Sequence, residues 1–342
     1  MSKPPSDGSA SSVSSTAGLD EFSVIKRFFT QTEQFPQSWP SQGVGDDCAF
    51  LDIGDSRIAV STDMLALGTH FLEGTSPYYV GRKVLAVNLS DLAAAGAKPQ
   101  AFFLSISLPR IDPQWLSEFS RGLMEQSHES GCPLRGGDTV RSPDGSNVTS
   151  FSVTILGEVP PQKGMTRVGA KEGDDVWVSG TPGDAFAALG SAWHIIEPKE
   201  SDKEYFFARL QNPTPRVALG QALLDLASAC ADISDGLVGD LGHILERSGV
   251  SAVLLWSQMP RSDAMKNLPL SDQYHCVLSG GDDYELIFTA PQGNRDKISA
   301  LDGKFGCRVT RIGTVTSSAE PFAVMDDEGK HIPVALSFNH FA

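Results

Sequence analysis

The chain has 342 residues, of which 40% are hydrophobic and 20% are charged, so it is long enough to bury a sizeable core and to form two domains of ordinary size. This composition excludes a fibre, a small disulfide-bonded scaffold and a wholly disordered chain. Lys and Arg number 27 against 42 Asp and Glu, which gives a formal net charge of −15. A negative field of this size repels nucleic acid and anionic membranes, so we expect neither as a partner.

The five cysteines are widely spaced, include no C-x-x-C pair and leave an odd one over. This pattern favours reduced, buried thiols in a cytosolic protein over a disulfide framework. No apolar run approaches the roughly 20 residues that a membrane helix needs, and the first residues lack the apolar core of a signal peptide. We therefore expect a soluble, cytoplasmic protein.

The N-terminal half begins with a tail, residues 1–19, that is rich in Ser, Pro, Gly and Ala and is expected to be disordered. A helical pattern follows Asp20, with Phe22, Ile25, Phe28 and Phe29 on one face. Further along, the pattern predicts strands at 48–53, 57–61, 101–108 and 148–156 and helices at 80–95 and 113–129. A run with two prolines and a glycine at 159–164 indicates a boundary, so the first domain is expected over 20–160.

The C-terminal half, residues 161–342, repeats the alternation and is expected to form the second domain. Its pattern predicts strands at 175–179, 252–256, 285–289 and 309–315, and helices at 184–195, 216–228 and 236–247. Strands and helices that alternate in both halves predict a mixed α/β (α+β) fold with two domains.

The candidate chemistry lies in short acidic motifs, because the chain has no Walker loop, no G-x-G-x-x-G, no H-E-x-x-H and no G-x-S-x-G. Six Asp-containing segments are flanked by Gly, Ser or Thr: Gly45-Asp46-Asp47, Ser61-Thr62-Asp63, Asn88-Leu89-Ser90-Asp91, Gly136-Gly137-Asp138-Thr139, Asp232-Ile233-Ser234-Asp235-Gly236 and Gly280-Gly281-Asp282-Asp283. Carboxylates beside Gly suit a hard cation such as Mg²⁺ and a phosphate group. Any one motif alone is better explained as a turn or a helix N-cap, but six of them together favour a magnesium and phosphate site.

Asp91 is the most informative of these residues because it lies in an otherwise apolar helical segment, where an unpaired carboxylate is costly to bury. A metal or a cationic partner would relieve that cost. The alternative is a solvent-facing stripe through Asn88, Asp91 and Ala95. Three basic residues lie in or near the motif regions and could neutralise transferring phosphate oxygens: Lys83, Arg141 and Arg167.

In their order and spacing, the six motifs resemble those of the thiamine-monophosphate kinase family, which belongs to a superfamily with AIR synthetase, selenophosphate synthetase and a hydrogenase maturation protein. The segments 83–99, 167–170 and 280–286 extend the resemblance, which covers 20–341. It implies an AIR-synthetase-like fold in which the N-terminal domain sheet pairs with that of a second subunit. The resemblance also implies a homodimer that binds ATP at its interface through Mg²⁺ ions.

The resemblance further implies the residues of the site. The implied metal ligands are Asp46, Ser61, Thr62, Asp63, Asp91, Asp138, Asp232 and Asp235, of which Asp91, Asp232 and Asp235 are expected to be catalytic. The implied ATP contacts are Gly137, Arg167 and Ser234. Thiamine phosphate is expected at His70, Asp282 and Phe338, and the family usually has Glu at the position of Asp282.

The implied activity is transfer of the γ-phosphoryl group of ATP to the phosphate of thiamine monophosphate, which gives thiamine diphosphate. The acceptor oxygen is already ionised, so catalysis is expected to rest on alignment of two anions and on screening by Mg²⁺. One alternative is another ATP-using member of the superfamily that acts on a formamidine, selenide or carbamoyl group. Another is a non-catalytic acidic module that binds divalent cations.

Overall fold

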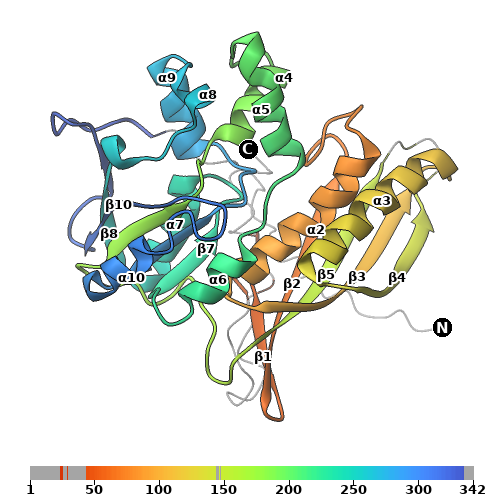
Figure 1. The fold of residues 1–342 in the computed structure, drawn as a ribbon, viewed down its shortest axis with the longest axis horizontal. Coiled ribbons are helices and arrows are strands. Elements are labelled where there is room, and N and C mark those ends of the chain that lie inside the picture. Colours follow the sequence, from red (N-terminus) through yellow and green to blue (C-terminus); the bar gives the residue numbers. More distant parts are fainter. Residues whose placement is uncertain (1–23, 26–28, 30–43, 144–145, 147, 335–342) are drawn as a thin grey trace, which may run out of the picture. The chain divides into compact units, whose positions relative to one another are not determined.

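The computed structural model describes residues 24–25, 29, 44–143, 146 and 148–334. The expected tail, nearly all of the helical pattern after Asp20, and Phe338 lie outside these residues. The elements described below belong to one unit, Pro36–Phe338, and build two β-sheets with helices packed against them (Figure 1). A mixed α/β fold is thereby confirmed.

The first sheet has the strand order β1-β2-β5-β3-β4. Its strands are β1 (Ala49–Ile53), β2 (Ser56–Ala66), β3 (Lys98–Leu108), β4 (Leu134–Arg141) and β5 (Ser150–Val159). Neighbouring strands are antiparallel except for β3 and β4, which are parallel. Strand β2, which carries Ser61, Thr62 and Asp63, is therefore an internal strand, whereas β4, which carries Gly136 to Thr139, is an edge strand.

Helices α2 (Pro77–Ala94) and α3 (Pro113–Ser130) pack on one face of this sheet (Figure 1). Their close approach requires glycine, because a β-carbon at Gly81 or Gly122 would overlap a backbone carbonyl of the opposite helix. Alternate sheet residues such as Phe102 and Phe151 are fully buried beneath the two helices. Nearly all of α2 is buried, which explains its continuous apolar sequence.

The other face of the first sheet is exposed. Met64 on β2 is 58% exposed and Phe103 on β3 is 42% exposed, and every residue of β4 is exposed. In the part of the chain that the structure describes, no helix packs on this face. A sheet face that exposes large apolar side chains beside an open edge strand is typical of a surface that pairs with another chain.

The second sheet has the order β11-β8-β10-β6-β9-β7 and is antiparallel except between β8 and β11. Its strands are β6 (Asp175–Ser179), β7 (Ala229–Asp232), β8 (Val250–Leu255), β9 (Leu286–Ala290), β10 (Val309–Ser317) and β11 (Ala323–Met325). The helices of this half are α4 (Asp184–Ala192), α5 (Glu200–Gln211), α6 (Val217–Leu223), α7 (Leu237–Ser248), α8 (Asp263–Lys266), α9 (Leu270–Tyr274) and α10 (Arg295–Ser299). No helix among the described residues is both long and apolar enough to cross a membrane.

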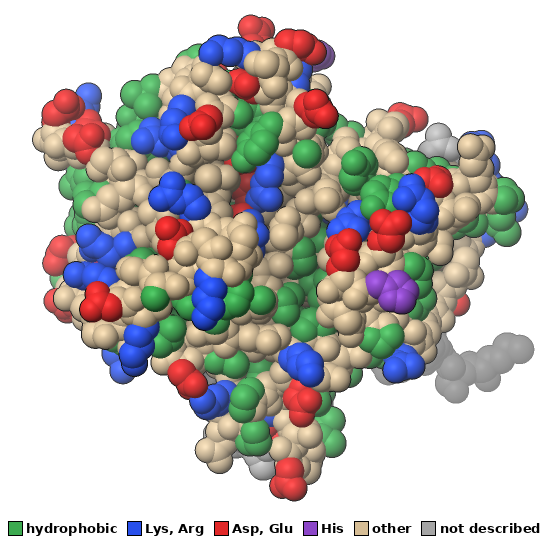
Figure 2. Space-filling model, viewed as in Figure 1, with side chains coloured by type: hydrophobic (Ala, Val, Ile, Leu, Met, Phe, Trp, Pro, Cys, Tyr) green, Lys and Arg blue, Asp and Glu red, His purple; other side chains and the backbone are tan. Residues whose placement is uncertain are grey.

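Most predicted elements are present, and the differences have local causes. Strand β4 was not predicted because Gly136 and Gly137 in its centre are typical of a loop. The sequence predicts a helix over 216–228, but α6 ends at Leu223 and the chain returns as the short strand β7. On the face shown in Figure 2, acidic and basic side chains are interspersed and form no continuous basic surface.

Candidate active site

Three carboxylates from distant segments converge between the two sheets. Asp47 precedes β1, Asp91 lies on α2, and Asp232 ends β7; one oxygen of each lies within 4.8 Å of the others. Asp91 is 9% exposed and Asp232 is 3% exposed. Like charges at this separation and burial repel strongly unless protons or a cation compensate them. The arrangement therefore suits a divalent cation that prefers oxygen ligands, such as Mg²⁺.

The surroundings of Asp91 show why a helix can carry a buried acid. Burial raises the pKa of Asp91 well above its ordinary value, and the neighbouring Asp63, Asp232 and Asp47 raise it further. The hydroxyl of Ser61 on β2 donates to Asp91 and favours its ionised form. Asp91 is thus turned toward other polar groups, and the solvent-facing stripe that was the alternative interpretation is wrong.

Asp232 has a comparable environment. Burial raises its pKa well above the ordinary value and the charge of Asp47 adds to this, whereas a hydrogen bond from the Ser90 hydroxyl, 2.6 Å long, opposes it. Ser90 belongs to α2 and Asp232 to the second sheet, so the bond ties the two halves of the site together. Ser90 is part of an acidic motif, but its sequence context indicates no role for it.

The neighbouring Asp46 and Asp47 carboxylates point toward different partners. Asp46 accepts a hydrogen bond of 2.7 Å from the backbone N–H of Arg167 and forms an ion pair of 3.0 Å with Arg247. Asp47 points into the three-carboxylate cluster and pairs with the Arg167 guanidinium. Burial raises the pKa of Asp47, while Arg167 lowers it. The sequence predicted Asp46 as the metal ligand. Only its position directly after Asp46 could have pointed to Asp47.

The residues expected on β2 face in alternate directions. Ser61 and Asp63 lie on the helix side, where the charge of Asp63 acts on Asp91 and its backbone N–H donates to Asn88 at 3.2 Å. Thr62 lies on the exposed face, and its hydroxyl donates to the Val153 carbonyl at 2.9 Å. In this chain Thr62 is thus directed away from the three carboxylates.

The Gly137-Asp138 segment lies apart from the cluster. It occupies β4, three strand spacings or roughly 14 Å from β2 across the sheet, and Asp138 is exposed. The Asp138 carboxylate accepts from the N–H of Thr139 at 2.8 Å. A β-carbon at Gly137 would overlap the Leu104 carbonyl, so glycine keeps β4 close to β3.

Ser234 and Asp235 lie in the turn between β7 and α7, and this turn is organised by a residue outside the predicted set. One carboxylate oxygen of Asp240 accepts the backbone N–H groups of Ser234, Asp235 and Gly236 at 3.1, 3.1 and 3.2 Å. Asp240 is buried, and burial raises its pKa to about 8. The sequence could have indicated this role, because Asp240 is an acid in the first turn of α7, directly after the Asp232 to Gly236 motif.

The residues expected at the phosphate acceptor, His70 and Asp282, meet through Lys83. The Lys83 ammonium lies 2.6 Å from the Asp282 carboxylate and 3.0 Å from the His70 carbonyl oxygen. The His70 ring accepts the N–H of Ala66 at Nδ1, which places the proton of the neutral ring on Nε2.

The other acids of the 282–285 segment serve the fold. Asp283 accepts backbone N–H groups at the start of α4, and Glu285 is fully buried with Arg209 and Arg216 against its carboxylate. Among the acids of this segment, Asp282 alone keeps a partly exposed side chain, at 18%. It is therefore the acid of this segment that a substrate can reach.

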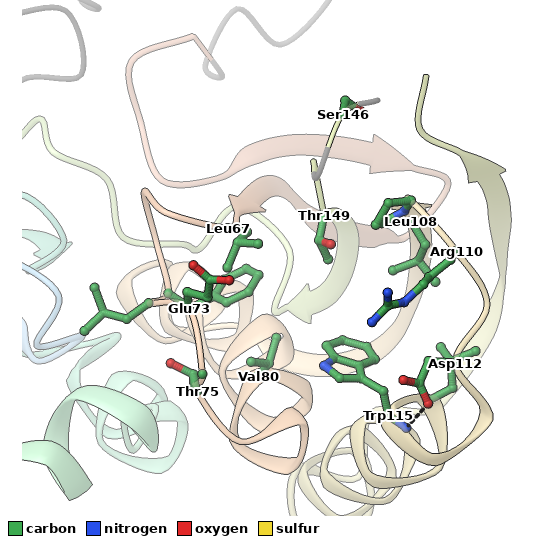
Figure 3. A pocket seen from close by; sticks show the side chains of 15 residues that line it. Leu67, Glu73, Thr75, Val80, Leu108, Arg110, Asp112, Trp115, Ser146 and Thr149 are labelled. Carbon is green, nitrogen blue, oxygen red and sulfur yellow. Dashed lines mark hydrogen bonds between the residues drawn. The ribbon is translucent and has the colours of Figure 1, made fainter. Parts of the chain in front are cut away.

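A pocket of about 660 Å³ adjoins the His70 turn. Leu67 and Glu73 line one wall, Val80 of α2 forms its floor, and Arg110 and Trp115 lie opposite (Figure 3). The mixture of an indole ring, aliphatic side chains and both signs of charge suits an organic ligand larger than a metal ion.

The chain matches known proteins along most of its length. Residues 45–159 match the AIR synthase related protein N-terminal domain, and residues 171–326 match the corresponding C-terminal domain. The thiamine-monophosphate kinase of Salmonella typhimurium is 40% identical over 328 residues, which cover 94% of this chain and 98% of the relative.

Solved structures agree with these matches. The thiamine-monophosphate kinase of Stenotrophomonas maltophilia K279a superposes with a TM-score of 0.74 at 39% identity, and the match covers 92% of this chain and 98% of that one. AaThiL complexed with AMPPCP and TMP superposes with a TM-score of 0.78 at 30% identity, covering 94% and 97%.

Proposed function

The chain belongs to the AIR synthase related family and, within it, to the thiamine-monophosphate kinases, and we propose that it phosphorylates thiamine monophosphate at the site built around Asp47, Asp91 and Asp232. ATP is the phosphoryl donor and thiamine diphosphate the product. A relative of known structure holds an ATP analogue together with TMP, which supports this pair of substrates.

The observation that carries the proposed site is the convergence of the three carboxylates, with oxygens within 4.8 Å of one another. Asp47, Asp91 and Asp232 would hold Mg²⁺, with Asp63 and Asp235 on adjoining segments as further acids. When bound, Mg²⁺ supplies positive charge that screens the repulsion between the two anionic reactants. Without a cation, burial first and then the charges of the neighbouring acids raise the pKa values of Asp91 and Asp232.

The residues of the chain then have separate tasks. Arg167, held against Asp47 and through its backbone against Asp46, is a fixed cation beside the cluster. Asp240 fixes the turn that carries Ser234, so that this hydroxyl is presented at a constant place. No side chain has to remove a proton from the acceptor, because a phosphate oxygen is already ionised at neutral pH. Positioning and charge therefore account for the catalysis.

We further propose a homodimer that pairs through the exposed face and the edge of the first sheet. The exposed Met64 and Phe103 support this surface. The placement of Gly137 and Asp138, on β4 and about 14 Å from β2 of the same chain, supports a role for these residues in the site of the second subunit. In a dimer with twofold symmetry, the two β4 strands would occupy equivalent positions, so each could serve the site of the other subunit.

The cytoplasm is the proposed location. The five cysteines are all free and buried, which suits a reducing compartment. ATP as co-substrate is consistent with the same compartment.

A direct assay tests the function. Purified protein is incubated with ATP, Mg²⁺ and thiamine monophosphate, and the products are separated by chromatography. Thiamine diphosphate and ADP in equal amounts are expected. ADP formed only with a formamidine, selenide or carbamoyl substrate would favour the other chemistry of the superfamily, and Mg²⁺ binding with no turnover of any substrate would favour a non-catalytic acidic module.

A further inference from the structure

Lys83 is a buried cation that joins three segments far apart in sequence. Its side chain is 4% exposed, and its ammonium donates to the carbonyl oxygen of His70 at 3.0 Å and to the Asp282 carboxylate at 2.6 Å. Lys83 lies on α2 of the first half, whereas Asp282 belongs to the turn before β9 of the second. A buried ammonium is tolerated only where acceptors compensate its lost hydration.

Asp282 is held at its backbone as well as at its side chain. Its N–H donates to the carbonyl oxygen of Ser234 at 2.8 Å, and its φ of 73° lies in the left-handed region that non-glycine residues rarely adopt. Such a conformation persists only where the surroundings enforce it. The preceding Gly281 has no room for a side chain, because a β-carbon there would overlap the Ser234 carbonyl.

One face of α2 connects this contact with the carboxylate cluster. Val80, Lys83, Val87 and Asp91 lie within about 80° of one another around the helix axis, and Lys83 precedes Asp91 by eight residues, or about 12 Å along the axis. Val80 lines the pocket beside the His70 turn. Lys83 therefore lies between the pocket and the acids that would hold the metal.

We propose that Lys83 is a positioning residue for the phosphate acceptor: its ammonium holds the His70 main chain and the Asp282 carboxylate in one fixed relation, so that thiamine monophosphate is aligned with ATP. This inference rests on the proposed function. Lys83 is matched in charge by Asp282, so its role is to orient the acceptor site, and Arg167 is the cation beside the carboxylate cluster.

The experiment compares Lys83→Met with Arg82→Met. Arg82 is the matched control, since it lies on the same helix and is also buried. Its side chain donates to Asn212 of the second half at 2.7 Å and pairs with Glu129, rather than with His70 or Asp282. Lys83→Met should raise the KM for thiamine monophosphate by about 30-fold or more, as expected for loss of one partner of a buried charged pair, and leave the KM for ATP within about 2-fold. Arg82→Met should leave both constants near the wild-type values.

The double variant Lys83→Met/Asp282→Asn separates positioning from stability. It removes both charges, so its thermal midpoint should recover toward that of the wild type, while the KM for thiamine monophosphate should stay high. Recovery of the KM together with stability, or an equal effect of Arg82→Met, would overturn the inference. Absence of turnover by the wild type would contradict the proposed function itself, whereas normal kinetics of Lys83→Met beside an active wild type would contradict this inference alone.

Discussion

The Ser90 hydroxyl donates a buried hydrogen bond of 2.6 Å to Asp232, a residue 142 positions further along the chain. The bond stabilises the ionised carboxylate and so opposes the burial that raises the pKa of Asp232. Ser90 does not belong to the three-carboxylate cluster, but its hydroxyl favours the ionised form of Asp232, which is the form that the proposed Mg²⁺ site requires.

Ser90→Ala should increase the Mg²⁺ concentration needed for half-maximal activity by about 10-fold, because a hydrogen bond to a charged group contributes about 1.5 kcal/mol or more. A magnesium titration of the kinase rate measures this. Ser127→Ala is the control, since Ser127 is also buried but donates to the Cys132 carbonyl. Equal magnesium requirements in the two variants would speak against the role of Ser90.

Asp91→Asn should abolish turnover and leave the fold intact, because it keeps the size of the side chain and removes one of three converging charges. In EDTA the variant should melt about 2 °C or more above the wild type, since like charges no longer repel. Mg²⁺ should then stabilise the wild type but not the variant. Differential scanning calorimetry checks both effects, and a variant with wild-type turnover would refute the metal assignment.

The stability of the metal-free protein should fall as the pH rises. The ordinary pKa of Asp is 3.8, and burial raises the pKa of Asp240 to about 8 and those of Asp91 and Asp232 in the same direction. The native state therefore holds protons that the unfolded chain has released, and this contribution to stability, complete below pH 3.8, is lost as the pH rises through the raised values.

Thermal unfolding in EDTA at about pH 6 and about pH 9 measures this dependence, and the midpoint should be lower at the higher pH. Added Mg²⁺ should stabilise more at the higher pH, where the acids are ionised. Asp240→Asn should reduce the slope in EDTA, whereas Asp55→Asn, at an exposed turn, should not. A midpoint that rises with pH in EDTA would contradict the raised pKa values.

Asp46→Asn and Asp47→Asn distinguish two neighbouring acids. Asp47→Asn should eliminate the stabilisation by Mg²⁺, because Asp47 contributes an oxygen to the cluster. Asp46→Asn should retain it and lose mainly the ion pair with Arg247. Calorimetry with and without Mg²⁺ measures the stabilisation of each variant. If Asp46→Asn loses the stabilisation and Asp47→Asn keeps it, Asp46 is the ligand, as expected from the sequence.

A mixture of Asp91→Asn and Asp138→Asn subunits tests whether Asp138 acts in the second subunit. If it does, a mixed dimer keeps one of its two sites with both acids. Random reassociation of equal amounts makes about half of the dimers mixed, so about a quarter of the wild-type activity should return. Each variant alone should be inactive. A mixture that stays inactive although mixed dimers are detected by native mass spectrometry would place Asp138 in the site of its own chain.

The sequence by itself determined the mixed α/β fold and most of its elements, because apolar periodicity and turn residues act locally. It also identified the acidic motifs, including Asp91 and Asp232, which meet in space. Local signals could not reveal β4, where two glycines conceal a strand, or β7, which is only four residues long.

Tertiary structure decided which members of each motif come together in space. Asp46 and Asp47 are equivalent in the sequence, but only the packed chain directs one toward Arg247 and the other toward Asp91. Likewise, long-range contacts bury Glu285 among arginines and bring Lys83 to Asp282. Local pattern fixes backbone conformation, whereas the direction of a side chain and its distant partners depend on how the elements pack.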